Sequence, residues 1–210
     1  MQDIALFLFD YTTTMAQPWG AAGVTCYCVD IQHQQGELTE GNIVKVGADL
    51  HRWIPPRGNI VFVAAFPPCT HLAVSGSRWF RTKGLYALGD SILLFARARE
   101  IATNSGAPWF LENPVSTISS YWRKPDHTFE PCHYGGYEGG EQDAYTKKTC
   151  LWTGGGFVMP KAKRIHPIDG SRMHKLPPSS ERANLRSATP KGFARAVFEA
   201  NYKAELKMAA

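Results

Sequence analysis

The side chains best suited to chemistry in this chain are carboxylates and one thiol that follow short apolar runs. Asp10, Asp30, Asp49, Cys69 and Glu112 all stand at the ends of such runs. Apolar runs of this length are typical of buried strands, and ligands bind beyond the carboxyl ends of strands in a parallel sheet. A thiol with a carboxylic acid close by is a combination suited to nucleophilic catalysis. We therefore expect these side chains to meet at one edge of a sheet.

Cys69 is the strongest candidate for a nucleophile. It follows Pro67-Pro68, and two prolines stiffen a turn because each fixes its own φ angle and removes an N–H group. Glu112-Asn113-Pro114 has the same design, with a carboxylate after an apolar run and a proline behind it. The competing interpretation is that Cys69 is a buried structural cysteine, the usual state of a free cysteine. We expect that state for the other four cysteines, Cys26, Cys28, Cys132 and Cys150.

Asp10 and Asp30 are candidates for binding a nucleoside-type cofactor. An acidic residue that ends the second strand can accept hydrogen bonds from ribose hydroxyls. The alternative is that each aspartate caps a helix or starts a turn, which is the commoner role for any single one of them.

The elements that must position these residues follow a β-α-β alternation. Strands are expected at 4–9, 24–29, 44–46, 59–65, 108–111 and 149–152, and helices at 15–22, 85–103 and 190–207. The apolar face of the long helix is expected to include Leu85, Leu93 and Phe95. This alternation predicts an α/β fold with a mostly parallel sheet and helices on both faces.

Composition restricts the class of protein further. The 210 residues are enough for one substantial core, and the 23 basic against 18 acidic residues give a formal net charge of +5 without a long basic run. No apolar run approaches the length of a membrane span, and the first ten residues do not resemble a signal peptide. Five cysteines without a C-x-x-C pair favour neither a disulfide framework nor a metal site. We expect a cytoplasmic protein with no membrane partner.

The order of these pieces resembles the cytosine-C5 DNA methyltransferases, particularly their short phage-encoded relatives. The family's Pro-Cys and Glu-Asn motifs resemble Pro68-Cys69 and Glu112-Asn113. The resemblance extends over nearly the whole chain, and its other pieces are Phe9-Asp10 with the loop after it, Val29-Asp30-Ile31, Ala48-Asp49-Leu50, 147–152 and 186–190. It implies a Rossmann-like fold of the S-adenosylmethionine-dependent methyltransferases. For a phage-encoded protein, the expected location is the cytoplasm of the bacterial host.

The resemblance also implies roles for individual residues. Cys69 would attack C6 of cytosine, Glu112 would hydrogen-bond the ring, and Asn113 would hold the catalytic loop. Lys148 or Lys147 would contact the base or a phosphate. The residues implied to bind S-adenosylmethionine are Asp10, Tyr11, Thr12, Asp30, Ile31, Asp49, Leu50 and Pro67.

The chain departs from the family pattern in two places. The family's glycine-rich first loop is Thr12-Thr13-Thr14 here, and a loop-rich stretch at 153–181 stands where relatives usually carry a target-recognition domain. We therefore predict a single methyltransferase-like domain over 1–210. It would act on DNA with little sequence specificity of its own or with a protein partner that supplies specificity.

Phosphate contacts are expected from the basic residues of that stretch, Lys161, Lys163, Arg164, His166, Arg172, His174 and Lys175. Three alternative functions stay open. They are modification of a free pyrimidine nucleotide, use of a different one-carbon donor, and a DNA-binding relic without catalysis.

Overall fold

A mixed eight-stranded sheet forms the centre of the structure, a computed structural model that describes residues 2–202. Its strands lie in the order β3-β4-β2-β1-β5-β6-β8-β7. Their bounds are β1 Asp3–Leu8, β2 Thr25–Val29, β3 Gly36–Glu40, β4 Ile43–Gly47, β5 Asn59–Ala65, β6 Trp109–Pro114, β7 His127–Phe129 and β8 Thr149–Gly154. The five central strands β4, β2, β1, β5 and β6 are parallel to one another. Strand β3 at one end of the sheet and strands β8 and β7 at the other end pair antiparallel.

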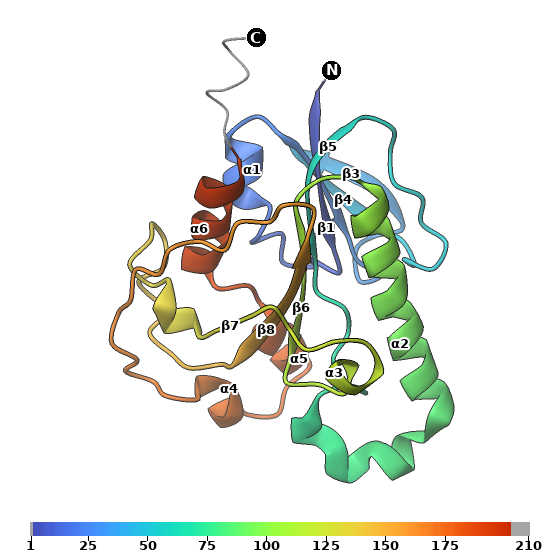
Figure 1. The fold of residues 1–210 in the computed structure, drawn as a ribbon, viewed down its shortest axis with the longest axis vertical. Coiled ribbons are helices and arrows are strands. Elements are labelled where there is room, and N and C mark those ends of the chain that lie inside the picture. Colours follow the sequence, from blue (N-terminus) through green and yellow to red (C-terminus); the bar gives the residue numbers. More distant parts are fainter. Residues whose placement is uncertain (1, 203–210) are drawn as a thin grey trace.

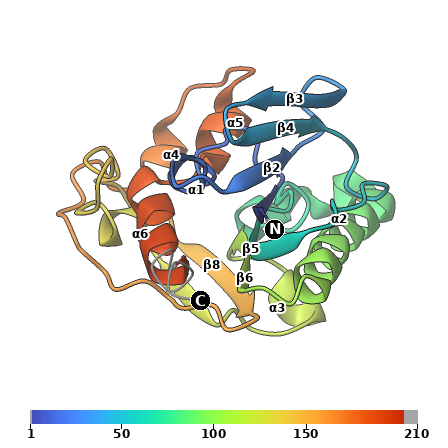
Figure 2. The ribbon, with the colours of Figure 1, turned by 90° about the horizontal axis from the view of Figure 1, so that it is seen from above.

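Helices cover both faces of the sheet, as expected from the sequence (Figures 1 and 2). They are α1 Gln17–Ala21, α2 Phe80–Asn104, α3 Ile118–Tyr121, α4 Arg172–Lys175, α5 Arg182–Ser187 and α6 Lys191–Asn201, with 3-10 turns η1 Val74–Trp79 and η2 Pro131–His133. On one face, Trp19 of α1 stacks on Phe62 of β5 at 4.5 Å and meets Phe198 of α6. On the other face, Phe95 of α2 meets Trp152 of β8. The α/β prediction is confirmed, with a sheet that is mixed rather than wholly parallel.

The connections place a switch point between β1 and β5. From β1 the chain runs through α1 to β2 and β4 on one side, and then returns to β5 on the other side. The loops that leave β1 and β5 therefore diverge at their carboxyl ends, where open α/β sheets bind ligands. These are the loops that carry Asp10 and Cys69.

Several predicted elements have different bounds in the structure. Strand β6 continues through Glu112 and Asn113, because these residues pair with Leu151 and Cys150 of β8. Strands β3 and β7 were not predicted, since β3 is exposed throughout and β7 has only three residues, so neither has an apolar run. Within the predicted loop stretch, β8 reaches Gly154 and α4 forms a short helix, while 155–171 contain neither helix nor strand.

The two long predicted helices also differ. Helix α2 begins at Phe80 and is interrupted at Gly84, whose φ of 76° and ψ of 171° are not helical. Leu85 and Leu93 were expected on the buried face, but they are 84% and 60% exposed. Leu93 lies between Ile92 and Leu94, which pack against the core, so its side chain is on the outer face of α2. Helix α6 ends at Asn201, and positions 203–207 of the prediction lie outside the described residues. Among the residues described, no helix is long and apolar enough to cross a membrane.

Candidate active site

The loop after β1 has an unusual backbone. Phe9 and Thr13 adopt positive φ angles of 60° and 56°, and among residues 2–202 no other residue except glycine does so. A β-branched residue such as threonine is strained in this left-handed region, which glycine enters freely. Strain of this kind, of order 1–3 kcal/mol per residue, clusters at functional sites. Thr13 therefore keeps a backbone conformation that a glycine-rich loop would favour.

This loop and the end of β2 form a pocket that we name the acidic pocket. It encloses about 280 Å³, part of it open to solvent, and is lined by Phe9, Asp10, Tyr11, Thr12, Asp30, Gln32, Phe66, Ser187 and Thr189. Asp10 is only 3% exposed; its Oδ1 accepts a hydrogen bond from Thr12 Oγ1 at 3.2 Å, and its Oδ2 has no partner among the described residues. Asp30 Oδ1 accepts a hydrogen bond from the Gln32 amide at 2.8 Å.

Burial controls the ionisation of Asp10. Desolvation raises its pKa to about 7, and the negative charge of Asp30 adds to this rise, while hydrogen bonds such as that from Thr12 oppose it. A buried carboxyl group with a free oxygen needs a donor or a cation to compensate it. The acidic pocket is therefore suited to a ligand that carries positive charge, hydroxyl groups or both.

The other predicted cofactor residues do not line this pocket. Ile31 is 74% exposed, although its neighbour Gln32 does line it. Asp49 has the commoner role of a turn residue, since its Oδ1 accepts from the His51 amide at 3.0 Å, and Leu50 is buried in the core under α2. Pro67 is buried, and its carbonyl accepts a hydrogen bond from Asn113 Nδ2 at 2.9 Å. That bond ties the loop of Cys69 to strand β6.

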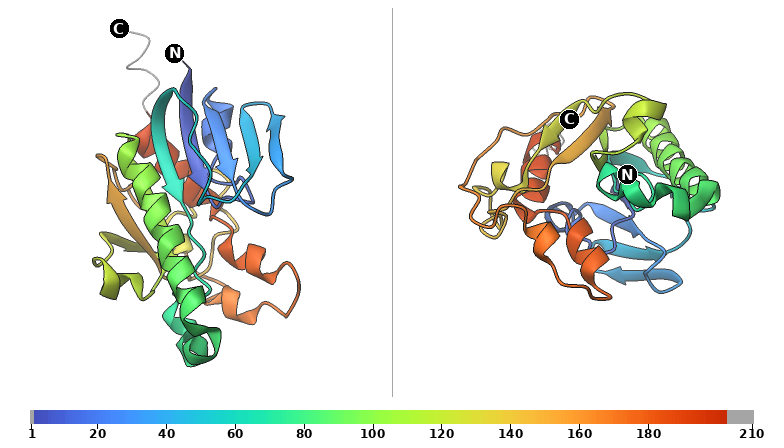
Figure 3. Two further views of the ribbon diagram at one scale, coloured as in Figure 1. Left: turned by 90° about the vertical axis from the view of Figure 1, so that its right-hand side faces the viewer. Right: turned by 90° about the horizontal axis from the view of Figure 1, so that it is seen from below.

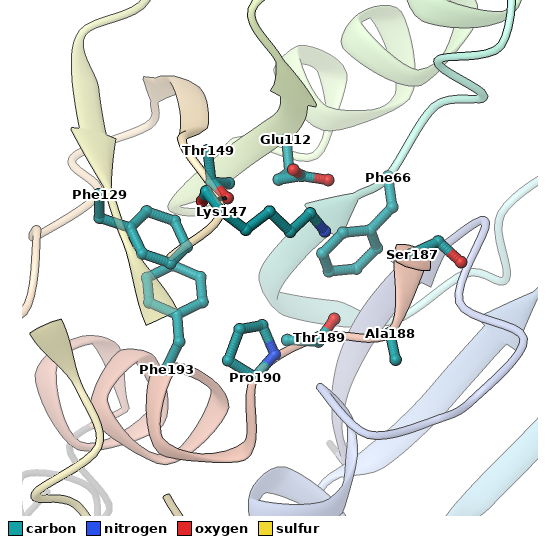
Figure 4. Close-up of a pocket in the computed structure, with 10 residues that line it drawn as sticks. All are labelled: Phe66, Glu112, Phe129, Lys147, Thr149, Ser187, Ala188, Thr189, Pro190 and Phe193. Atoms are coloured by element: carbon teal, nitrogen blue, oxygen red, sulfur yellow. Dashed lines mark hydrogen bonds between the residues drawn. The ribbon is translucent and has the colours of Figure 1, made fainter. Parts of the chain in front are cut away.

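A second pocket lies beside the first, and we name it the Glu112 pocket (Figure 4). It encloses about 240 Å³, part of it open to solvent, and is lined by Phe66, Glu112, Phe129, Lys147, Thr149, Ser187, Ala188, Thr189, Pro190 and Phe193. Glu112 Oε1 is buried and has no hydrogen-bond partner among the described residues. Desolvation raises the pKa of Glu112, and the charge of Lys147 opposes that rise. Burial thus favours the protonated form of this carboxyl group, and Lys147 favours the carboxylate.

Cys69 is the only one of the five cysteines that is not buried. Burial of the thiol raises its pKa above the ordinary value of 9.0, and the charge of Glu112 adds to this. The charges of Lys147 and Arg186 act in the opposite direction, so they limit the rise that burial causes. Cys69 itself lines neither pocket, but the hydrogen bond from Asn113 to the Pro67 carbonyl holds its loop against strand β6, which carries Glu112.

Of the two candidate lysines, Lys147 lines the Glu112 pocket and Lys148 does not. Lys147 extends between Glu112 and Phe66 (Figure 4). Lys148 is exposed; burial raises the pKa of Glu130, and the charge of Lys148 opposes that rise. Successive residues leading into β8 point to opposite sides, so only one of the two lysines can enter the pocket.

The two pockets share a wall made of Phe66, Ser187 and Thr189. Sequence reasoning did not single out these three residues, nor Phe129 and Phe193, whose rings stack at 4.1 Å on the far side of the Glu112 pocket. For Ser187 and Thr189, the available sequence signal was the resemblance of segment 186–190 to a motif of the methyltransferase family. Nothing in the sequence singled out Phe66 except its place before Pro67.

Comparison with known proteins adds no further information about the site. A scan of protein-family models finds no match to this chain, and a search of curated proteins finds none either. Within residues 2–202, no group of three or more histidine, cysteine, aspartate or glutamate side chains could hold a metal ion.

Proposed function

We propose that this chain transfers a methyl group from S-adenosylmethionine to C5 of cytosine in DNA, through a covalent bond between Cys69 and C6. The observation that carries the proposal is the pair of pockets that share Phe66, Ser187 and Thr189. One contains two carboxylates, and the other contains an acid and a lysine near a thiol. A group transfer between two bound molecules requires adjoining sites of this kind.

The acidic pocket is chemically suited to S-adenosylmethionine. This molecule has a sulfonium, an ammonium and two ribose hydroxyl groups, which Asp10 and Asp30 can receive as cations and hydrogen-bond donors. The free Oδ2 of Asp10 gives one buried acceptor that such a ligand would satisfy. When bound, S-adenosylmethionine would supply an electrophilic methyl group.

The residues of the Glu112 pocket would activate the base. Cytosine C5 is a weak nucleophile, and addition of the Cys69 thiolate to C6 makes it enamine-like. Protonated Glu112 would donate a hydrogen bond to N3 and accept one from the exocyclic amine, which stabilises the charge that develops on the ring. Lys147 and Arg186 would favour the thiolate that starts the reaction. Loss of the C5 proton to water and cleavage of the C6–S bond then restore the aromatic ring and the thiolate.

The fold supports the same proposal. Both pockets lie where the loops of β1 and β5 diverge, and Asn113 Nδ2 holds the Pro67 carbonyl two residues before Cys69. This tether limits the positions that the thiol can take relative to Glu112, which lies beside Asn113 on the same strand. A base in a duplex would have to leave the stack to enter such a pocket, at a cost of a few kcal/mol.

The test is a trapping experiment. The protein is incubated with S-adenosylmethionine and an oligonucleotide that contains 5-fluorocytosine, whose C5 fluorine cannot leave as a proton does. Intact-mass analysis should find protein plus oligonucleotide plus one methyl group, with the bond at Cys69. Cys69→Ser should give no adduct, whereas Cys132→Ser, which changes a buried cysteine outside both pockets, should still give it. Absence of any adduct from the folded wild-type protein would overturn the proposal.

A further inference from the structure

The segment 74–86, which we name the basic arm, differs from the rest of the chain in composition and burial. It comprises η1 and the part of α2 around the interruption at Gly84. The segment contains Arg78, Arg81 and Lys83, and no acidic residue occurs between Thr70 and Gly89. No residue of the arm is buried, and the first buried residue of α2 is Ser91. The arm therefore does not contribute to the core.

Hydrogen bonds nevertheless connect the arm to the loop that carries Cys69. The amides of Leu72 and Ala73 donate to the Cys69 carbonyl at 3.0 and 2.8 Å, and the Val74 amide donates to the Val115 carbonyl at 3.0 Å. Lys83 Nζ donates to the carbonyl of Thr70, the residue after Cys69. In Figures 1 and 3 the arm extends past the carboxyl ends of the strands. A molecule bound along the arm would consequently lie next to the Cys69 loop.

The arm exposes cations and aromatic rings, together with the aliphatic side chains of Val74 and Leu85. The guanidinium of Arg78 lies over the ring of Trp79 at 5.1 Å, and Trp79 is 52% exposed. Tyr86 is 98% exposed. Within residues 2–202, no carboxylate forms an ion pair with Arg78 or Arg81. The two arginines are therefore available to an anionic partner.

The basic loop that the sequence predicted to contact phosphates makes contacts within the protein. The carbonyl of Lys161 accepts from Tyr137 Oη at 2.7 Å, and that of Lys163 accepts from the Gly136 amide at 2.9 Å. Lys163 Nζ lies 3.9 Å from the centre of the Tyr137 ring. Figure 1 shows this part of the chain along the flank beside α6, away from the arm. Of the two basic segments, only the arm combines free arginines with exposed aromatic rings at the Cys69 loop.

We propose that the basic arm is a binding surface for single-stranded DNA, which places a nucleotide beside Cys69. Proteins that bind single strands combine cations along the backbone with aromatic side chains on which bases stack. Arg78 and Arg81 provide the first feature, and Trp79 and Tyr86 provide the second. A duplex keeps its base faces stacked inside, so the exposed rings of the arm favour an unpaired strand. The proposal goes beyond the methyl transfer, since it concerns binding without any donor.

The test compares two double variants that lose the same charge. Arg78→Ala with Arg81→Ala changes the arm, and Lys161→Ala with Lys163→Ala changes the flank loop. Binding of a labelled oligodeoxycytidylate of about 12 nucleotides, within the site sizes of known single-strand binders, is followed by fluorescence anisotropy at several salt concentrations. The arm variant should flatten the slope of log K against log salt by about 1.4, since each phosphate contact on a single strand contributes about 0.7. The flank variant should keep the wild-type slope.

A third variant tests stacking. Trp79→Ala should weaken binding of the single strand by about five- to 150-fold, the range that corresponds to loss of one stacked base, and Trp79→Phe should restore most of it. Equal slopes for the two double variants, unchanged affinity in Trp79→Ala, or a duplex that binds at least as well as the single strand would each overturn the proposal. Because Arg78, Trp79 and Arg81 are all exposed, the arm variants should keep the wild-type melting temperature.

The single-strand binding proposal and the proposed methyl transfer can each fail without the other. If the arm variants bind normally while the wild type forms the methylated adduct, the arm proposal fails and the methyl transfer stands. If binding depends on the arm and no adduct forms, the reverse holds.

Discussion

The two adjoining pockets differ in how the chain builds them. Apart from the shared wall, the acidic pocket comes from two short segments, 9–12 and 30–32, which follow neighbouring strands. None of its lining residues is a lysine or an arginine. The Glu112 pocket gathers residues from β6, β7, the lead into β8, and the turn before α6, and it includes Lys147. The first pocket concentrates negative charge, and the second places opposite charges near one thiol.

Under the proposed function, this difference would separate two requirements of a group transfer. A site that holds a cationic donor needs acceptors and little else, which two strand ends can provide. A site that activates a poor nucleophile needs an acid, a thiol and a cation in fixed positions, which requires several strands. Variants of Cys69, Lys147, Asp10 and Asp30 test whether the two pockets have these separate roles, in order of decreasing expected effect.

Removing the thiol should have the largest effect, because it should stop methyl transfer and leave ligand binding in the acidic pocket unchanged. Cys69→Ser should lower methyl transfer at least about a thousandfold, a modest loss by comparison with other enzymes that have lost a nucleophile. Binding of S-adenosylmethionine, measured by calorimetry, should be unchanged because Cys69 does not line the acidic pocket. A variant that transfers methyl groups at the wild-type rate would contradict the assignment.

Removing the lysine should show that the cation belongs to the Glu112 pocket. Lys147→Met should slow methyl transfer by about a hundredfold at neutral pH, a loss typical of one electrostatic contact. Since Lys147 lowers the pKa of Cys69, the variant should need a higher pH for thiolate formation. Its rate–pH profile and the alkylation of Cys69 by iodoacetamide should both shift to higher pH.

Lys148→Met is the matched control for this experiment. Its side chain is exposed and acts on Glu130, so its rate and its pH profile should stay close to the wild type. Equal losses in both variants would show that general charge, rather than the position of Lys147, supports the reaction.

Asp10 should make the acidic pocket a source of pH-dependent instability. Its pKa rises from 3.8 unfolded to about 7 folded, so the folded state holds the proton more tightly. The resulting stability is complete below pH 3.8 and is lost as the pH rises through about 7. Asp10→Asn has no such loss. Between about pH 5 and about pH 8, the wild type should therefore lose roughly 2–3 kcal/mol of unfolding free energy relative to Asp10→Asn.

Denaturant unfolding at both pH values measures this difference. Parallel changes in the two proteins would mean that Asp10 does not titrate in this range. Saturating S-adenosylmethionine should shrink the difference, because a cationic ligand compensates the buried carboxylate.

The smallest expected effect concerns Asp30, one of the carboxylates proposed to bind the cofactor. Asp30→Ala should weaken S-adenosylmethionine binding by about 1–3 kcal/mol, the usual cost of losing a charged hydrogen-bond partner. Asp49→Ala should leave binding unchanged, because that side chain only supports the turn at His51. Calorimetry with both variants checks the difference, and equal losses would place the ligand elsewhere than in the acidic pocket.

The sequence by itself determined the features that depend on local chain properties. Apolar runs followed by Asp10, Asp30 and Cys69 were sufficient to predict buried strands that end in functional groups, because burial and strand geometry act over a few residues. The order of these runs also indicated a mostly parallel sheet. The acidic pocket, made from two such ends, was accordingly predicted in its main residues.

The tertiary structure decided which distant residues meet. Glu112 lies within β6 because β8 pairs with it, and the register of that pairing brings Lys147 rather than Lys148 to the carboxyl group. Ser187 reaches both pockets because α5 ends beside the loop of β5. Pairing and register depend on contacts between segments far apart in the chain, and a one-residue change of register turns every side chain to the opposite face. Local patterns contain no information about that choice.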